Sequence, residues 1–258
     1  MTIRDPAVPS GEYQEFYLTQ RPREHFRTSA LVGGPFARAI FAMAVRVDAA
    51  LEHPAKFVVV DVGAGEGELL TDLLGLARGT GLGRRLELIG VDLRERPSDL
   101  PDEIRWRRQT AQSFDESFDG LMLCTELFDD VPAGGGELAL QLARRVRNGQ
   151  MLIVDYAQSG EDRVEPTAYL RGRQVTAAGN DRNVTKHVDF QELSRVLSPL
   201  GSIVRMKQAQ AIEQLAPAAN DLTGIAALEH RSKLHVLTDP SGLGGHEWLW
   251  LTLGSATN

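Results

Sequence analysis

The chain has 258 residues, 42% of them hydrophobic and 24% charged, a composition that is typical of globular proteins and excludes disordered and fibrous classes. Its net charge of −7 argues against the broad positive surface that binds nucleic acid without regard to sequence. The single cysteine, Cys124, excludes an internal disulfide and a cysteine-based zinc site. The longest uncharged apolar stretch, 39–45, is too short to span a membrane, and the start shows no targeting segment, so we expect a cytoplasmic protein.

The first 54 residues are expected to form an arm and a helix that pack on the core. Residues 11–30 carry aromatic side chains among arginines, a mixture too polar for a core strand and too aromatic for a free tail. After Pro35, apolar residues recur at steps of three or four, which places them on one face of a helix. These residues are Phe36, Ile40, Met43, Val47 and Leu51. We expect this face to lie against a sheet.

From residue 55 onward, short apolar runs alternate with helical stretches. The runs are FVVVDV, LELIGVDL, IRW, GLMLCT and MLIVDYA, with helices up to about Arg78 and over 137–147. Runs that are continuously apolar belong to strands buried on both faces. The pattern therefore predicts an α/β domain over 55–258, with a mostly parallel sheet covered by helices on both sides.

The C-terminal part predicts two more helical stretches and two more strands. Asp189 and Glu192 form a pair like a capping box and open a helix. The strands are SIVRM and HEWLWLTL, and 209–230 is expected to be helical. The segment 158–186 is polar and irregular. It is expected to be either a lid or substrate-binding insertion or a surface excursion without function.

The strongest chemical signal is a glycine loop that follows the first buried strand. The run Val58-Val-Val-Asp-Val-Gly-Ala-Gly-Glu-Gly67 has G-x-G-x-G spacing, whereas dinucleotide folds prefer G-x-G-x-x-G. Glu66 and Glu68 would repel a pyrophosphate at the helix N-terminus. An acidic strand end, Asp61, before G-x-G-x-G instead suits S-adenosylmethionine (SAM), whose sulfonium and ammonium are positive and which has no phosphate. A glycine turn without a ligand is the alternative. The candidate cofactor contacts here are Asp61, Gly63, Ala64, Gly65 and Gly67.

The second strand ends in an acidic residue, Asp92, followed by Leu93. A carboxylate at this position can accept hydrogen bonds from both ribose hydroxyls of an adenosine, so both residues are candidate cofactor contacts. The alternative for Asp92 is a solvated acid that caps the next turn. Gln109 and Thr110 follow the third strand, where polar groups that contact adenine are expected.

Several segments resemble the MidA family of class I SAM-dependent methyltransferases, which includes the mitochondrial complex I assembly methyltransferase. Besides the glycine loop, they are Phe26-Arg-Thr-Ser29, Thr125-Glu-Leu-Phe-Asp-Asp-Val-Pro132, Met151-Leu-Ile-Val-Asp-Tyr156, Lys186-His-Val-Asp-Phe190 and Asp239-Pro-Ser-Gly-Leu-Gly244. The resemblance implies a doubly wound, Rossmann-like sheet of seven strands, SAM as cofactor and a protein arginine as methyl acceptor.

The chain also departs from the family pattern. Ala30-Leu31 stands where the family has Pro-Glu, and Thr125 stands where it has Asn. Two alternatives to protein methylation therefore stay open. One is methyl transfer to a small molecule, and the other is a SAM-binding assembly factor without turnover.

Glu126 and Asp129 are the candidate catalytic residues. They follow the fourth strand, and two carboxylates at that edge can hold a guanidinium and assist its loss of a proton. The alternative is that both acids cap the turn before Pro132.

Other polar residues have simpler explanations, and we predict no metal site. Asp189 is expected to cap its helix and His187 to hold the preceding loop. Cys124 is expected in the core, and the arginines within 105–108 on a solvated edge.

Overall fold

The computed structural model describes residues 28–131, 135–157, 167–170, 173–175, 183–185, 187–216 and 222–254. Residues 11–27 of the expected arm lie outside the described residues. The division of the chain at residue 54 therefore stays a prediction.

The core of the molecule is a seven-stranded sheet with the strand order β3-β2-β1-β4-β5-β10-β9. Its strands are β1 (Phe57–Val62), β2 (Leu86–Asp92), β3 (Ile104–Arg108), β4 (Phe118–Thr125), β5 (Val146–Asp155), β9 (Gly201–Lys207) and β10 (Glu247–Leu253). Six of these seven strands run in one direction, and β10 runs antiparallel to both of its neighbours, β5 and β9. This confirms the doubly wound, mostly parallel sheet. The strand order reverses between β1 and β4, and ligands of such folds bind at the carboxyl ends of the strands at this point.

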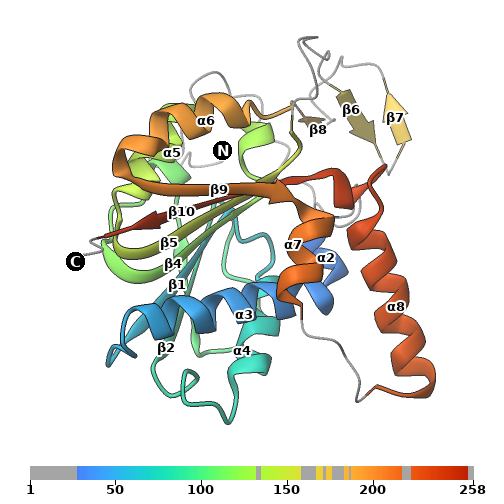
Figure 1. Ribbon diagram of the computed structural model, residues 1–258, viewed down its shortest axis with the longest axis horizontal. Helices are drawn as coiled ribbons and strands as arrows, with labels where there is room; N and C mark the ends of the chain where they lie inside the picture. Colours follow the sequence, from blue (N-terminus) through green and yellow to red (C-terminus); the bar gives the residue numbers. More distant parts are fainter. Residues whose placement is uncertain are drawn as a thin grey trace, which may run out of the picture.

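Helices cover both faces of the sheet (Figure 1). One layer contains α3 (Pro35–Ala50), α4 (Glu68–Ala77) and α7 (Gln208–Leu215), and the other contains α5 (Gly135–Ala143) and α6 (Phe190–Leu197). The strands are apolar on both sides: Val59 and Trp248 pack toward the first layer, whereas Val60 and Leu249 pack toward the second. Within the described residues, no helix has both the length and the apolar character needed to cross a bilayer.

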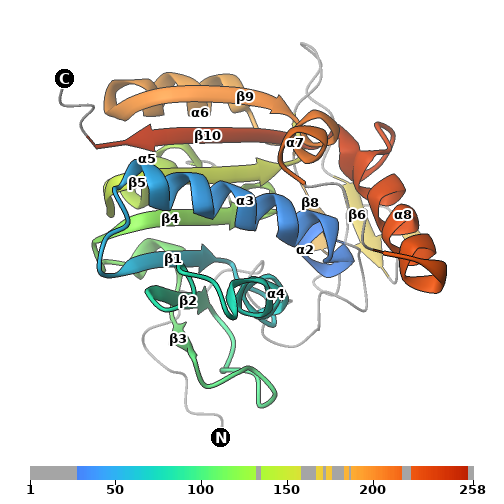
Figure 2. The same cartoon turned by 60° about the horizontal axis from the view of Figure 1, so that its bottom comes forward.

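Helix α3 has the apolar face that its sequence predicts. Phe36, Ile40, Met43 and Val47 are buried. The ring of Phe36 meets that of Trp248 edge to face, with centroids 5.7 Å apart, so the helix is anchored on β10. Figure 2 shows α3 running along this face of the sheet.

Two predicted element boundaries were wrong. The helix expected over 137–147 ends at Ala143, and β5 begins at Val146. In β5, Gly149 allows the strand to run close beside β4. A Cβ at this position would lie 1.9 Å from the carbonyl oxygen of Gly120. The stretch 209–230 forms parts of two helices, α7 and α8 (Gly224–Thr238), and 217–221 between them lie outside the described residues.

The insertion at 158–186 was expected to be irregular, but it contains three short strands. They are β6 (Thr167–Leu170), β7 (Arg173–Val175) and β8 (Asn183–Thr185), and they form an antiparallel sheet in the order β7-β6-β8. This small sheet lies beyond the carboxyl ends of the parallel strands (Figure 1). At its base, the N–H of Val188 donates to the carbonyl of Tyr156 at 2.7 Å. The insertion is therefore tied to the end of β5.

Candidate functional site

The glycine loop after β1 takes a conformation that favours glycine. Gly63, Gly65 and Gly67 have φ values of 79°, 66° and 80°, which lie in the left-handed region. The N–H groups of Gly63 and Ala64 both donate to the carbonyl of Val91, at 2.9 and 3.1 Å. These bonds hold the loop against the end of β2.

Asp92 lies directly beside this loop. Its Oδ2 accepts the N–H of Gly65 at 2.9 Å, and its Oδ1 accepts the N–H of Arg94 at 3.0 Å. The Arg94 guanidinium also pairs with Oδ1 at 3.0 Å. The structure thus places the predicted ribose-binding acid, Asp92, at the glycine loop. The same carboxylate also caps the turn that follows β2, through the N–H of Arg94. The next residue, Leu93, is half-buried.

Asp61 is buried near two other carboxylates. Its side chain is in the interior, and within the described residues its Oδ1 has no hydrogen-bond partner. Burial, assisted by the negative charges of Asp92 and Glu68, raises the pKa of Asp61 to about 7. A cation bound here would relieve this repulsion, whereas a phosphate would add to it.

The raised pKa of Asp61 predicts a pH-dependent stability. Its carboxyl has an ordinary pKa of 3.8 and a pKa of about 7 in the folded protein. The folded state therefore binds this proton more tightly than the unfolded state does. Protonation of Asp61 stabilises the folded protein fully below pH 3.8, and this stabilisation is lost as the pH rises through 7. Asp61→Asn is expected to remove this pH dependence of stability, because an amide does not titrate. Melting curves at about pH 5 and pH 8 should show wild type losing on the order of a few kcal/mol relative to the variant, and parallel curves would contradict the assignment.

Gln109 and Thr110 lie next to the end of β2. The backbone N–H of Gln109 donates to the carbonyl of Asp92 at 2.9 Å, and its side chain is half-buried. The Thr110 hydroxyl accepts the N–H of Ser113 at 3.1 Å and caps the short 3-10 turn η2 (Ala111–Ser113). The hydroxyl of Thr110 thus has a structural role, and the adenine contact of both residues stays a prediction.

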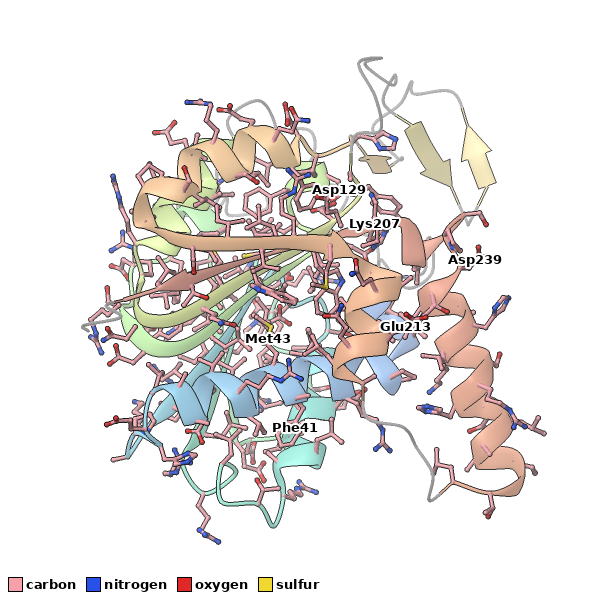
Figure 3. All side chains as sticks on the ribbon, in the orientation of Figure 1. Phe41, Met43, Asp129, Lys207, Glu213 and Asp239 are labelled. Atoms are coloured by element: carbon pink, nitrogen blue, oxygen red, sulfur yellow. The ribbon has the colours of Figure 1, made fainter. Side chains whose placement is uncertain are left out.

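The second part of the site lies at the end of β4. Glu126 has a φ of 52°, and its Oε1 accepts the backbone N–H of Ser29, at the start of α2 (Ser29–Val32), at 2.7 Å. Asp129 lies on the 3-10 turn η3 (Phe128–Asp130) and is buried. Figure 3 shows Asp129 near the carboxyl ends of the strands, together with Lys207, the last residue of β9. The structure thus brings both candidate acids to this edge of the sheet.

Sequence reasoning missed the role of Asp155. This buried carboxylate accepts the N–H groups of Phe128 at 2.8 Å, Asp129 at 3.3 Å and Tyr156 at 2.9 Å. It therefore fixes the turn that carries Asp129. The sequence did contain a signal for this residue, because Asp155, like Asp92, is an acid at the end of an apolar run.

His246 was also missed. It lies just before β10, is 1% exposed, and places its Nδ1 3.9 Å from Glu126 Oε1. Its ring meets that of Tyr156 edge to face with centroids 4.0 Å apart. In the sequence, only the turn over 239–244 pointed toward this position.

The simpler explanations hold for the remaining residues. Asp189 Oδ1 accepts two N–H groups at the start of α6, both at 2.9 Å, and Nδ1 of His187 bonds the carbonyl of Ala157 at 3.0 Å. Cys124 is in the core, where burial raises the pKa of its thiol. The arginines of β3, an edge strand of the sheet, form ion pairs with Glu95 and Glu116. Among the described residues, no group of three or more potential ligands is arranged to hold a metal.

Comparisons with known proteins support the fold. A candidate methyltransferase from Burkholderia thailandensis, crystallised with S-adenosylhomocysteine (SAH), is similar over 93% of this chain and 83% of its own, with a TM-score of 0.77 and 14% identity. An uncharacterised protein of the same superfamily and organism has a TM-score of 0.74 at 14% identity, over 94% and 83% of the two chains. The plantazolicin methyltransferase BpumL with SAH has a TM-score of 0.51 at 13% identity, over 95% and 90%. No protein-family model and no curated protein matches the sequence.

Proposed function

We propose that this protein is a SAM-dependent methyltransferase. The observation that carries the proposal is the grouping of Asp61, Glu68 and Asp92 around the G-x-G-x-G loop, at the end of β1. Three carboxylates favour a cationic ligand over a pyrophosphate. The similar fold of proteins crystallised with SAH supports the same cofactor.

The residues present fit the proposed cofactor. Asp92 would accept the ribose hydroxyls, and Asp61, which has a buried oxygen without a hydrogen-bond partner in the described residues, would face the positive charge. The open Cα of Gly65 would allow close approach to the backbone. When bound, SAM supplies an electrophilic methyl group. The protein then has to align the acceptor, exclude water and take up one proton.

For the acceptor, we propose a nitrogen, with a protein arginine as the first candidate. Glu126 and Asp129 support it, because two largely buried carboxylates at one edge suit a group that begins as a cation. The resemblance of the segment 125–132 to the MidA family points the same way. The small sheet of β6, β7 and β8 would lie on the side from which the acceptor enters.

Ligand-induced stabilisation tests the cofactor directly. We expect SAH to raise the melting temperature and NAD to leave it unchanged, because the carboxylates around the loop disfavour phosphates, and a ligand that binds only the folded state stabilises it. Thermal melting with each ligand at equal concentration provides the measurement. Equal shifts with the two ligands would contradict the proposal.

The acceptor can be found by incubating the protein with methyl-labelled SAM and a lysate of a strain that lacks it. Label on a protein, and on methylarginine after hydrolysis, would support the arginine proposal. Label in the small-molecule fraction would replace it with a small-molecule acceptor. SAH binding without any labelled product would indicate a SAM-binding factor without turnover.

Asp92→Asn is expected to weaken SAH binding roughly tenfold to a hundredfold, because it removes charge-assisted hydrogen bonds worth about 1.5–3 kcal/mol. Asp102→Asn is the control, since Asp102 is fully exposed and also pairs with an arginine. Calorimetry gives both affinities. An unchanged affinity of the Asp92 variant would remove this residue from the site.

A further inference from the structure

The position of His246 is fixed by its backbone. The N–H of His246 donates to the carbonyl of Leu243 at 3.1 Å, and its carbonyl accepts the N–H of Gln208 at 2.8 Å. Because β10 runs antiparallel to β5, its first residues lie at the edge where β4 and β5 end. The imidazole is therefore held beside the acids of the acceptor side.

The side chain of His246 is buried in the interior. Within the described residues, neither ring nitrogen has a hydrogen-bond partner. The carboxylate of Glu126 lies beside the ring, with its Oε1 3.9 Å from Nδ1, just beyond hydrogen-bond distance. Buried polar groups are almost always paired, and exceptions call for an explanation such as a role in catalysis.

The surroundings hold the imidazole neutral. Among the described residues, the charged and titratable groups that act on or contact it are Glu126, Tyr156 and Lys207. Burial, assisted by the positive charge of Lys207, lowers the pKa of His246 to about 3. A neutral imidazole has one N–H and one lone pair, and a carboxylate can only accept. The hydrogen is thus expected on Nδ1, toward Glu126, which leaves the lone pair on Nε2.

We propose that Glu126 and His246 form a carboxylate–imidazole pair in which Nε2 accepts the proton released by the methyl acceptor. This rests on the proposed methyl transfer. The lone pair of the acceptor nitrogen forms a bond to the methyl carbon, the carbon–sulfur bond breaks, and its electron pair stays on sulfur. The proton of the acceptor nitrogen passes to Nε2, and the Glu126 carboxylate stabilises the imidazolium that results. The proton leaves to solvent after the products depart.

The pair can be tested first in the free protein. Imidazole 15N chemical shifts, assigned by comparison with His246→Phe, report which ring nitrogen carries the hydrogen. We expect the hydrogen on Nδ1 of His246 in a neutral ring at pH 7.5. A hydrogen on Nε2 would overturn the proposal, because the lone pair would then face the carboxylate and no base would remain.

Turnover provides the second test. With the acceptor found by methyl labelling, His246→Gln and His246→Phe should each lower kcat by about 10²-fold or more while SAH affinity stays near wild type. The Phe variant keeps a ring against Tyr156, so its melting temperature controls for folding. His235→Gln, on the exposed side of α8, is the matched control. Wild-type turnover in both His246 variants would overturn the pair. Failure of wild type to bind SAH would instead refute the proposed function, and the shifts would still decide the tautomer.

Discussion

Gly65→Val is expected to abolish SAH binding, with a loss of at least about a hundredfold in affinity, equivalent to about 2.7 kcal/mol. A Cβ at this position would point into the space between Glu68 and Arg94, whose nearest atoms lie 3.5 and 3.8 Å away. The substitution therefore meets little in the free protein. Two further methyl groups would occupy the volume that a ligand beside Asp92 needs, since the Gly65 N–H itself bonds Asp92.

Gly79→Val separates this effect from backbone strain. Gly79 has a φ of 78°, against 66° for Gly65, and nothing lies within 4 Å of the position that a Cβ would take there. Both valines meet a left-handed backbone, which costs on the order of 1–2 kcal/mol. Calorimetry with SAH and thermal melting should show two proteins of similar stability, of which only the Gly79 variant binds. Normal binding by the Gly65 variant would mean that the loop is structural only.

The parts of the fold that follow from burial could be predicted from the sequence. Strands β1 and β4 are buried on both faces, so nearly all of their residues must be apolar, as the runs FVVVDV and GLMLCT show. The same holds for the apolar face of α3. The small sheet formed by β6, β7 and β8 was not predicted, because its segments are polar and lack the alternation that indicates a half-buried strand.

Those parts of the site that leave a local pattern in the sequence were predictable. Glycines that require positive φ, and an acid that ends an apolar strand, leave a local pattern, and so the loop and Asp92 were found. His246 has no such pattern. It reaches Glu126 only because β10 is inserted antiparallel beside β5, so 120 positions of sequence separate two side chains that lie 3.9 Å apart. Contacts of this kind depend on topology, and a single sequence does not reveal them.

For the acids after β4, we propose a role in binding the acceptor rather than in capping the turn. If Glu126 and Asp129 served only to cap the turn, their carboxylates would accept the N–H groups of η3. The N–H groups of Phe128 and Asp129 donate instead to Asp155. Glu126 bonds Ser29, far away in the chain, and has a positive φ that a glutamate rarely adopts. Strained backbone of this kind clusters at functional sites.

Glu126→Gln is therefore expected to lower turnover by roughly 10²-fold or more and to leave SAH affinity and melting temperature near wild type. The amide keeps an oxygen that can accept the Ser29 N–H, so the fold is preserved, but it loses the negative charge that would hold a cationic acceptor. Asp129→Asn should act in the same direction. Glu137→Gln, an exposed acid on the first turn of α5, serves as the control. Methyl incorporation, SAH calorimetry and thermal melting together decide the point: a lower melting temperature with undiminished turnover would show that Glu126 only supports the structure.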